Sequence, residues 1–132
     1  MSSHELDSAM MFIHPPLAIA GDVFIFLFAF SLSLARNKER KIIPFLGVAA
    51  WLLTFSGLVT GMIWAQIAWG SYWSWDPKET STLLLFITVS ASLAVYSEKK
   101  LKAATVLSIV ACVLSVITAS ISFILAGLHS FI

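Results

Sequence analysis

Four apolar segments, each about as long as a membrane-crossing helix, constrain the fold of this chain more than any other feature. Hydropathy places them at about 16–35, 42–68, 80–97 and 103–128. A helix needs about 20 mostly apolar residues to cross the hydrocarbon core of a bilayer, and there it satisfies all of its own backbone polar groups. The sequence therefore predicts an all-α integral membrane protein with four transmembrane helices.

Little of the chain is left over for a soluble domain. Of its 132 residues, 59% are hydrophobic and 11% are charged, against roughly 25% charged residues in ordinary soluble domains. We therefore expect a single membrane domain over residues 1–132. The formal net charge is +1 and no basic stripe with interleaved aromatic residues occurs, so we expect no nucleic-acid partner. The lone Cys112 has no second thiol to pair with.

The basic residues predict which helix ends face the cytoplasm. Seven of the eight Lys and Arg residues lie in two short segments, "RNKERK" after the first apolar segment and "SEKKLK" after the third. Short cytoplasmic loops are enriched in Lys and Arg. We therefore expect both chain termini, and an external loop at about 66–80, on the non-cytoplasmic side of the cell membrane.

The external loop, with "AWGSYWSWDPKET" at its centre, concentrates aromatic side chains. They are Trp69, Tyr72, Trp73 and Trp75. Trp and Tyr are common at both membrane interfaces, so anchoring at the interface is one explanation for each of them. Anchoring explains their position better than their density, because the two basic loops contain no tryptophan.

The end of this loop has the pattern of a helix start. Asp76 suits the N-cap, Pro77 suits the first helical position, and Glu79 stands where the acid of a capping box reaches back. The helix start directs the positive end of its dipole at the loop, and Lys78 adds a full charge. These features favour a bound molecule that carries carboxylates.

Haem is a flat, apolar and acidic molecule of this kind. Its macrocycle packs against aromatic rings, and its iron accepts imidazole nitrogens as axial ligands. His14 just before the first apolar segment and His129 just after the fourth are both expected on the side of the aromatic loop. Histidine also suits helix ends without binding a metal, so a structural role is the alternative for each.

The segment "WAQIAWGSYWSWDPKET" resembles the Trp-rich WWD signature of the haem-handling membrane proteins of cytochrome c assembly, the CcmC, CcmF and CcsA family. Its ending, "WDPKET", is closer to the CcsA type. "GLHSF" is similar to the segment with the family's second flanking histidine, and "FIHPPLAIAG" to the segment with the first. The resemblance covers most of the chain from about residue 12 onward.

This resemblance implies that His14 and His129 are the axial ligands of a haem b held on the extracytoplasmic side. The residues implied to form the platform beneath it are Trp69, Gly70, Trp73, Trp75 and Asp76. Tyr72 and Lys78, in the same segment, join them as candidate haem-binding residues. The implied function is to bind haem and deliver it to a haem chaperone or to apocytochrome c during cytochrome c maturation.

Family members usually have six or more crossings, and the CcsA and CcmF types carry further histidines within the membrane. This chain has no histidine inside a predicted helix, so it resembles a minimal member, or one part of a split system with other membrane subunits. It is then either a haem delivery protein or a component of a cytochrome c haem lyase or synthase. Two alternatives are a b-type cytochrome subunit that transfers electrons, and a haem-free membrane scaffold that docks a partner through its aromatic loop.

Two further features lie within the predicted helices. Asp22 is about 12 Å along the helix from His14, too far for contact, and an ionisable residue at such a depth is a functional candidate by default. A neutral or hydrogen-bonded structural acid is the alternative. Gly57 and Gly61 form a G-x-x-x-G pattern that favours close helix packing. The small and hydroxyl residues of 115–122 also favour helix association.

Overall fold

The described part of the chain is entirely helical and forms four helices. The computed structural model describes the backbone of residues 3–34 and 41–130, and the side chains of residues 13, 15–34, 41–121 and 124. The helices are α1 (Ser3–Leu34), α2 (Ile42–Trp69), α3 (Pro77–Ser97) and α4 (Leu101–Ser130). Each contains a stretch long and apolar enough to cross a membrane. The predicted all-α class is confirmed, and the four helices fit an integral membrane protein.

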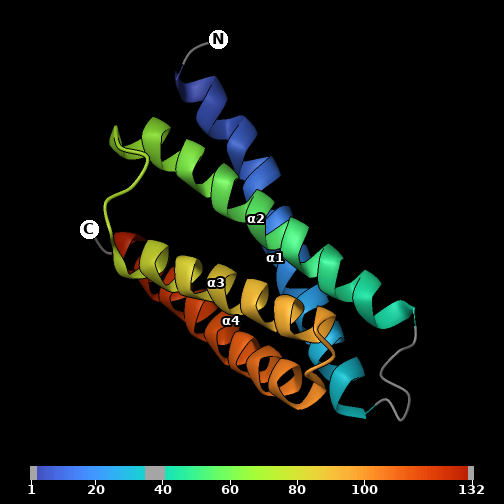
Figure 1. Ribbon diagram of the computed structural model, residues 1–132. Coiled ribbons are helices and arrows are strands. Elements are labelled where there is room, and N and C mark those ends of the chain that lie inside the picture. Colours follow the sequence, from blue (N-terminus) through green and yellow to red (C-terminus); the bar gives the residue numbers. More distant parts are fainter. Residues whose placement is uncertain (1–2, 35–40, 131–132) are drawn as a thin grey trace.

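The helices form two antiparallel pairs, α1 with α2 and α3 with α4 (Figure 1). The pairs diverge toward one end of the bundle, where residues 70–76 connect α2 to α3. The start of α1 and the end of α4 lie at this same end, which we call the loop end. The helix order thus brings the first, middle and last parts of the chain to one end of the molecule.

Small residues let α1 and α2 approach each other closely. A Cβ atom on Gly57 would lie 3.7 Å from the Cα of Ala18, and one on Gly21 would lie 3.4 Å from the backbone nitrogen of Thr54. Such contacts associate helices in lipid, where no hydrophobic force drives them together. The G-x-x-x-G pattern thus acts in helix packing at Gly57, and both Gly57 and Gly61 line a pocket.

Hydrogen bonds between side chains join the two pairs. Trp51 Nε1 in α2 donates to Ser90 Oγ in α3 at 2.8 Å, and Ser115 Oγ in α4 donates to Asp22 Oδ1 in α1 at 2.7 Å. The expectation that hydroxyl residues of 115–122 take part in helix association is therefore confirmed at Ser115.

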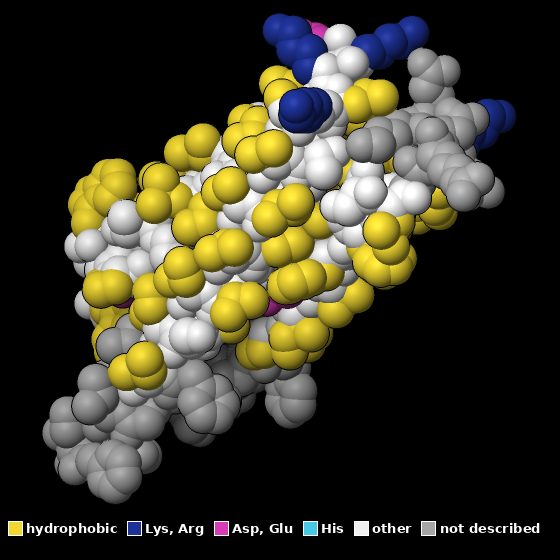
Figure 2. All heavy atoms as spheres, turned by 90° about the horizontal axis from the view of Figure 1, so that it is seen from below, with side chains coloured by type: hydrophobic (Ala, Val, Ile, Leu, Met, Phe, Trp, Pro, Cys, Tyr) yellow, Lys and Arg dark blue, Asp and Glu magenta, His cyan; other side chains and the backbone are white. Residues whose placement is uncertain are grey.

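Apolar side chains cover the flank of the bundle, and basic side chains gather at one end of it (Figure 2). The exposed basic residues at the start of α2 and around the α3–α4 turn are Lys41, Lys99, Lys100 and Lys102. On the flank, Phe30 and Phe45 are 64% and 62% exposed, as expected of side chains that face lipid. The described basic residues at these two turns thus lie opposite the loop end.

Candidate functional site

The connection between α2 and α3 is held by a cap at each end. Gly70 follows α2 with φ of 78°, and its N–H donates to the carbonyl of Gln66 at 3.0 Å. Glycine adopts this left-handed conformation without steric cost. Asp76 is the N-cap of α3, where its Oδ1 accepts the N–H of Glu79 at 2.7 Å, and Pro77 is the first helical residue. The predicted helix start at Asp76 and Pro77 is confirmed.

Glu79 differs from the capping-box prediction, in which its carboxylate reaches back to the amide of Asp76. Its Oε2 instead accepts the N–H of Ser74 at 2.7 Å. Between Ser74 and Asp76, Trp75 has φ of 59°, a left-handed conformation that is uncommon for a bulky residue. This turn brings the amide of Ser74 to the helix start, where Glu79 holds it.

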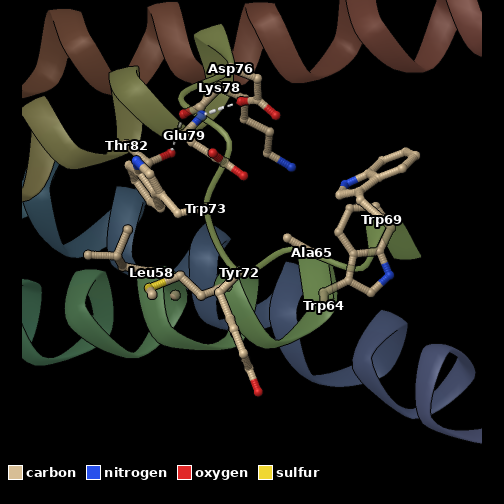
Figure 3. Close-up of a pocket in the computed structure, with 13 residues that line it drawn as sticks. Leu58, Trp64, Ala65, Trp69, Tyr72, Trp73, Asp76, Lys78, Glu79 and Thr82 are labelled. Atoms are coloured by element: carbon tan, nitrogen blue, oxygen red, sulfur yellow. Dashed lines mark hydrogen bonds between the residues drawn. The ribbon is translucent and has the colours of Figure 1, made fainter. Parts of the chain in front are cut away.

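A pocket lies between the loop-end half of α2, the connection and the first turns of α3 (Figure 3). The empty space in and in front of it amounts to about 470 Å³, much of which is open to solvent. Its aromatic lining residues are Trp64, Trp69, Tyr72 and Trp73, and its charged ones are Asp76, Lys78 and Glu79. Aromatic walls with a few charged groups are typical of a cofactor site.

The tryptophan rings around this pocket pack edge to face. The ring centroids of Trp64 and Trp69 are 6.0 Å apart at an interplanar angle of 74°, and those of Trp73 and Trp75 are 5.4 Å apart at 89°. Trp69 and Tyr72 are both more than half exposed. The loop end therefore presents open aromatic surface against which a flat apolar molecule can pack.

Lys78 is the positively charged group of the pocket. Its ammonium lies 5.8 Å from the ring centroid of Trp64, within the range of a cation–π interaction, and Figure 3 shows it extending across the pocket. The carboxylates of Asp76 and Glu79 both accept backbone N–H groups. Among the described residues no carboxylate lies within salt-bridge distance of Lys78, although the charge of Asp76 acts on it from farther away. The Lys78 ammonium therefore keeps room for a direct contact with an acidic ligand.

The indole nitrogen of Trp73 is a second unused polar group. It is buried and has no hydrogen-bond partner among the described residues. Leaving a buried donor without an acceptor costs about 1–3 kcal/mol, and folded proteins contain few such groups. A ligand oxygen that accepted this N–H would remove the cost.

The structure brings most of the predicted haem-binding residues together. Those that line the pocket are Trp69, Tyr72, Trp73, Asp76 and Lys78. Gly70 and Trp75 belong to the same connection but do not line the pocket. Gly70 shapes the turn after α2, and the ring of Trp75 contacts that of Trp73 from outside.

The two predicted histidine ligands are described only by their backbone. His14 lies within α1, which begins at Ser3, so it does not precede the helix as expected, although it does lie just before the membrane-crossing stretch that starts at Pro15. His129 likewise lies within α4, which continues to Ser130, rather than after it. Both helices extend past their apolar segments. The side chains of both histidines lie outside the described residues.

Trp64 is a pocket residue that the sequence analysis did not single out. Its ring contacts Trp69, and the ammonium of Lys78 lies near its face. The available signal was its place in α2, little more than one helical turn before Trp69, near the end of the helix that leads into the aromatic connection.

Comparison with known proteins identifies relatives of this chain. Its residues 1–129 match the family described as cytochrome C assembly protein. The cytochrome c biogenesis protein CcsA of Trichormus variabilis is 45% identical over 62 residues, which are 47% of this chain and 17% of that protein. CcsA of Synechococcus elongatus is 45% identical over 62 residues, or 47% and 19% of the two chains. CcsA of Synechococcus sp. strain CC9605 is 39% identical over 64 residues, or 48% and 21%. No solved structure matches the chain.

The family match covers nearly all of the described structure. It includes the pocket, the connection of residues 70–76 and almost the whole of the four helices. The curated relatives are much longer, and the stretch they share with this chain spans only 17–21% of their length. The resemblance seen in the aromatic connection is confirmed at the level of the family, and this chain belongs to the cytochrome c assembly protein family.

Proposed function

We propose that this chain binds haem at the loop end of the bundle and delivers it for cytochrome c maturation. The relatives that it matches are cytochrome c biogenesis proteins. The observation that carries the proposal is the pocket between α2 and α3, in which aromatic walls surround the unpaired ammonium of Lys78. A flat apolar molecule with carboxylates fits this chemistry, and haem is such a molecule.

The unused polar groups of the pocket support haem as the ligand. Haem has two propionates, and among the described residues two donors of the pocket lining have no partner acceptor, the Lys78 ammonium and the buried Trp73 Nε1. Trp64 and Trp69 then pack against the macrocycle. We propose haem b as the form that is bound.

We propose His14 as the first axial ligand, and the register of α1 against α2 supports it. Ala18 faces Gly57, and Gly21 faces Thr54. Because α1 and α2 are antiparallel, one further helical turn toward the loop end pairs the backbone of His14 with that of Gly61. Gly61 lines the pocket.

His129 is proposed as the second axial ligand, supported by the register of α3 against α4. The hydroxyls of Ser81 and Thr118 form a hydrogen bond between these helices. At 1.5 Å per residue, the backbone of His129 lies about 16 Å beyond Thr118, whereas α3 starts only about 6 Å beyond Ser81. The end of α4 thus reaches past the start of α3, to the level of the connection.

We further propose that the loop end, with both chain termini, faces the extracytoplasmic side of the cell membrane. The basic residues of the α2 start and of the α3–α4 turn gather at the opposite end (Figure 2), and cytoplasmic ends of membrane proteins carry such residues. We also propose that residues 1–132 form a single membrane domain, which the packing of the four helices into one bundle supports.

In the proposed mechanism this chain contributes binding and positioning. When haem is bound, the aromatic side chains would cover the macrocycle, Lys78 and Trp73 would hold its propionates, and the two histidines would hold its iron. Haem itself supplies the iron and the macrocycle that the cytochrome requires. Because the site opens at the loop end, haem can pass to a haem chaperone or to apocytochrome c once the histidines release it. The proposed partners include other membrane subunits of a cytochrome c assembly system, with this chain as delivery protein or as a component of a haem lyase or synthase.

Substitution of the histidines tests the proposal. We expect His14→Ala and His129→Ala each to reduce the haem absorbance that copurifies with the protein, and the double variant to lose nearly all of it. His4→Ala is the matched control, because His4 lies ten residues before His14 in the same helix and is expected to have no role. An unchanged haem content in the double variant would refute the ligand assignment.

A further inference from the structure

Asp22 is an acidic side chain within a membrane-crossing segment, and it does not line the haem pocket. The crossing stretch of α1 begins at Pro15, so Asp22 lies about 10 Å inside it at 1.5 Å per residue. Its Oδ1 accepts the hydroxyl of Ser115 at 2.7 Å. Asp22 is half-buried, whereas Ser115 is only 3% exposed. This hydrogen bond joins α1 to α4.

Ser115 satisfies only part of the carboxyl group of Asp22. An ionised carboxylate has two oxygens and about four acceptor positions, and Ser115 is its hydrogen-bond donor among the described residues. The described basic residues lie at the ends of the bundle. Ionisable groups inside membranes are costly and almost always pair with another group. Within the described residues, Asp22 therefore lacks the cationic partner that its depth favours.

The surface around Asp22 is apolar and open. Ile19 and Phe26 lie one helical turn to either side of Asp22 on α1, and they are 63% and 45% exposed. On α4, Val116 follows Ser115 and is 55% exposed. The α2 helix contacts α1 elsewhere, at Gly21 and its neighbours. Contacts between transmembrane helices often contain a polar group flanked by apolar side chains, as this surface does.

We propose that Asp22, held by the buried Ser115, marks the docking surface for a further transmembrane helix that carries a Lys or Arg at the same depth. Charge complementarity specifies the chemistry of that helix, because a carboxylate in the membrane is best matched by a cation. Sequence outside this chain can supply that helix, because the stretch that this chain shares with its CcsA relatives is only 17–21% of their length. The proposal does not depend on haem binding.

A synthetic transmembrane helix tests this surface directly. The protein is reconstituted in phosphatidylcholine vesicles with a tryptophan-free leucine–alanine peptide that has one central lysine and a terminal dansyl group. Energy transfer from the protein's tryptophans to dansyl reports binding. We expect the lysine peptide to bind about three- to thirtyfold more tightly than the same peptide with leucine at its centre, the range of interhelical polar contacts in membranes.

Variants of the protein distinguish this surface from others. The preference for lysine should fall in Asp22→Asn, disappear in Asp22→Leu, and remain in Ser115→Ala, which keeps the carboxyl group. Thr88→Val is the matched control, because it removes another hydroxyl from a membrane-crossing helix, and it should leave the preference unchanged. Moving the lysine by one turn within the peptide should weaken binding to the wild-type protein, a comparison that does not depend on the folding of any variant.

Three results would overturn the proposal. The first is equal binding of the lysine and leucine peptides to the wild-type protein, and the second is a lysine preference that survives in a folded Asp22→Leu protein. The third is a dimer of the wild-type protein, measured without peptide, that dissociates in Asp22→Leu, since the occupant of this surface is then a second copy of the chain.

Discussion

Substitution of Asp76 separates two roles of this residue, the capping of α3 and contact with a ligand. Its Oδ1 accepts the N–H of Glu79 at 2.7 Å, and the side chain also lines the pocket. Alanine at position 76 removes both the capping oxygen and the negative charge. Serine removes the charge but keeps an oxygen that can cap. The comparison of Asp76→Ala with Asp76→Ser therefore isolates the cap.

The size of the effect follows from this one hydrogen bond and the helix dipole. Replacing a capping residue by alanine costs about 0.5–2 kcal/mol, and the charge of an acid at a helix start contributes about 0.3–1 kcal/mol. We therefore expect Asp76→Ala to lower the free energy of unfolding by about 1–2 kcal/mol and Asp76→Ser by less than about 1 kcal/mol. If the cap holds the connection in its haem-binding shape, 1 kcal/mol corresponds to about fivefold weaker haem binding.

Two measurements on the purified protein check this expectation. Denaturant unfolding in detergent, followed by circular dichroism, gives the stability, and titration with haem followed by absorbance gives the affinity. Asp76→Ser should stay close to the wild-type protein in both. A serine variant that is as stable as the wild type but binds haem as weakly as Asp76→Ala would refute the capping argument, because it would show that the carboxylate acts on the ligand directly.

Three further predictions concern the pocket and the helix contacts. Lys78→Gln should weaken haem binding about tenfold, as expected for a hydrogen bond to a charged group. Binding of haem dimethyl ester, which lacks carboxylates, should not change in the same titration. Equal losses for both ligands would argue against pairing of Lys78 with the propionates. Gly70→Ala should destabilise the protein by about 1–2 kcal/mol in denaturant unfolding, since the left-handed backbone disfavours a side chain although nothing lies within 4 Å of the added Cβ; unchanged stability would contradict this. Ser90→Ala should cost about 1–3 kcal/mol in the same assay because it leaves the N–H of Trp51 without its acceptor, and Trp51→Phe in the Ser90→Ala background should recover part of that loss.

Local features of the sequence were sufficient for the parts of the structure that depend on neighbouring residues. The helices follow from the apolar segments, because a membrane leaves a continuous apolar chain few alternatives to a helix. The cap at Asp76 and the proline after it were predictable because an N-cap involves only residues within one turn. The family signature was readable for the same reason, since its tryptophans lie within one short segment.

Contacts that depend on the path of the chain were decided only by the tertiary structure. The carboxylate of Glu79 accepts the amide of Ser74 rather than that of Asp76 because Trp75 turns the backbone, a conformation that its residue type does not predict. The partnership of Asp22 with Ser115 joins residues 93 positions apart, and it exists because α1 packs beside α4. No local pattern encodes such a pairing, since it depends on the angle and register of whole helices.

The pocket shows the same division between sequence and structure. The aromatic residues of the connection were evident in the sequence, but Trp64 enters the pocket only because α2 and α3 diverge at the loop end (Figure 1). Within the described part of the chain, Trp73 Nε1 has no acceptor and Lys78 no salt bridge, and this too results from the packing of surrounding groups. Residue types thus determined which chemical groups this protein can offer to a ligand. The packing of the two helix pairs decided which of those groups have a partner among the described residues, because pairing depends on positions in space.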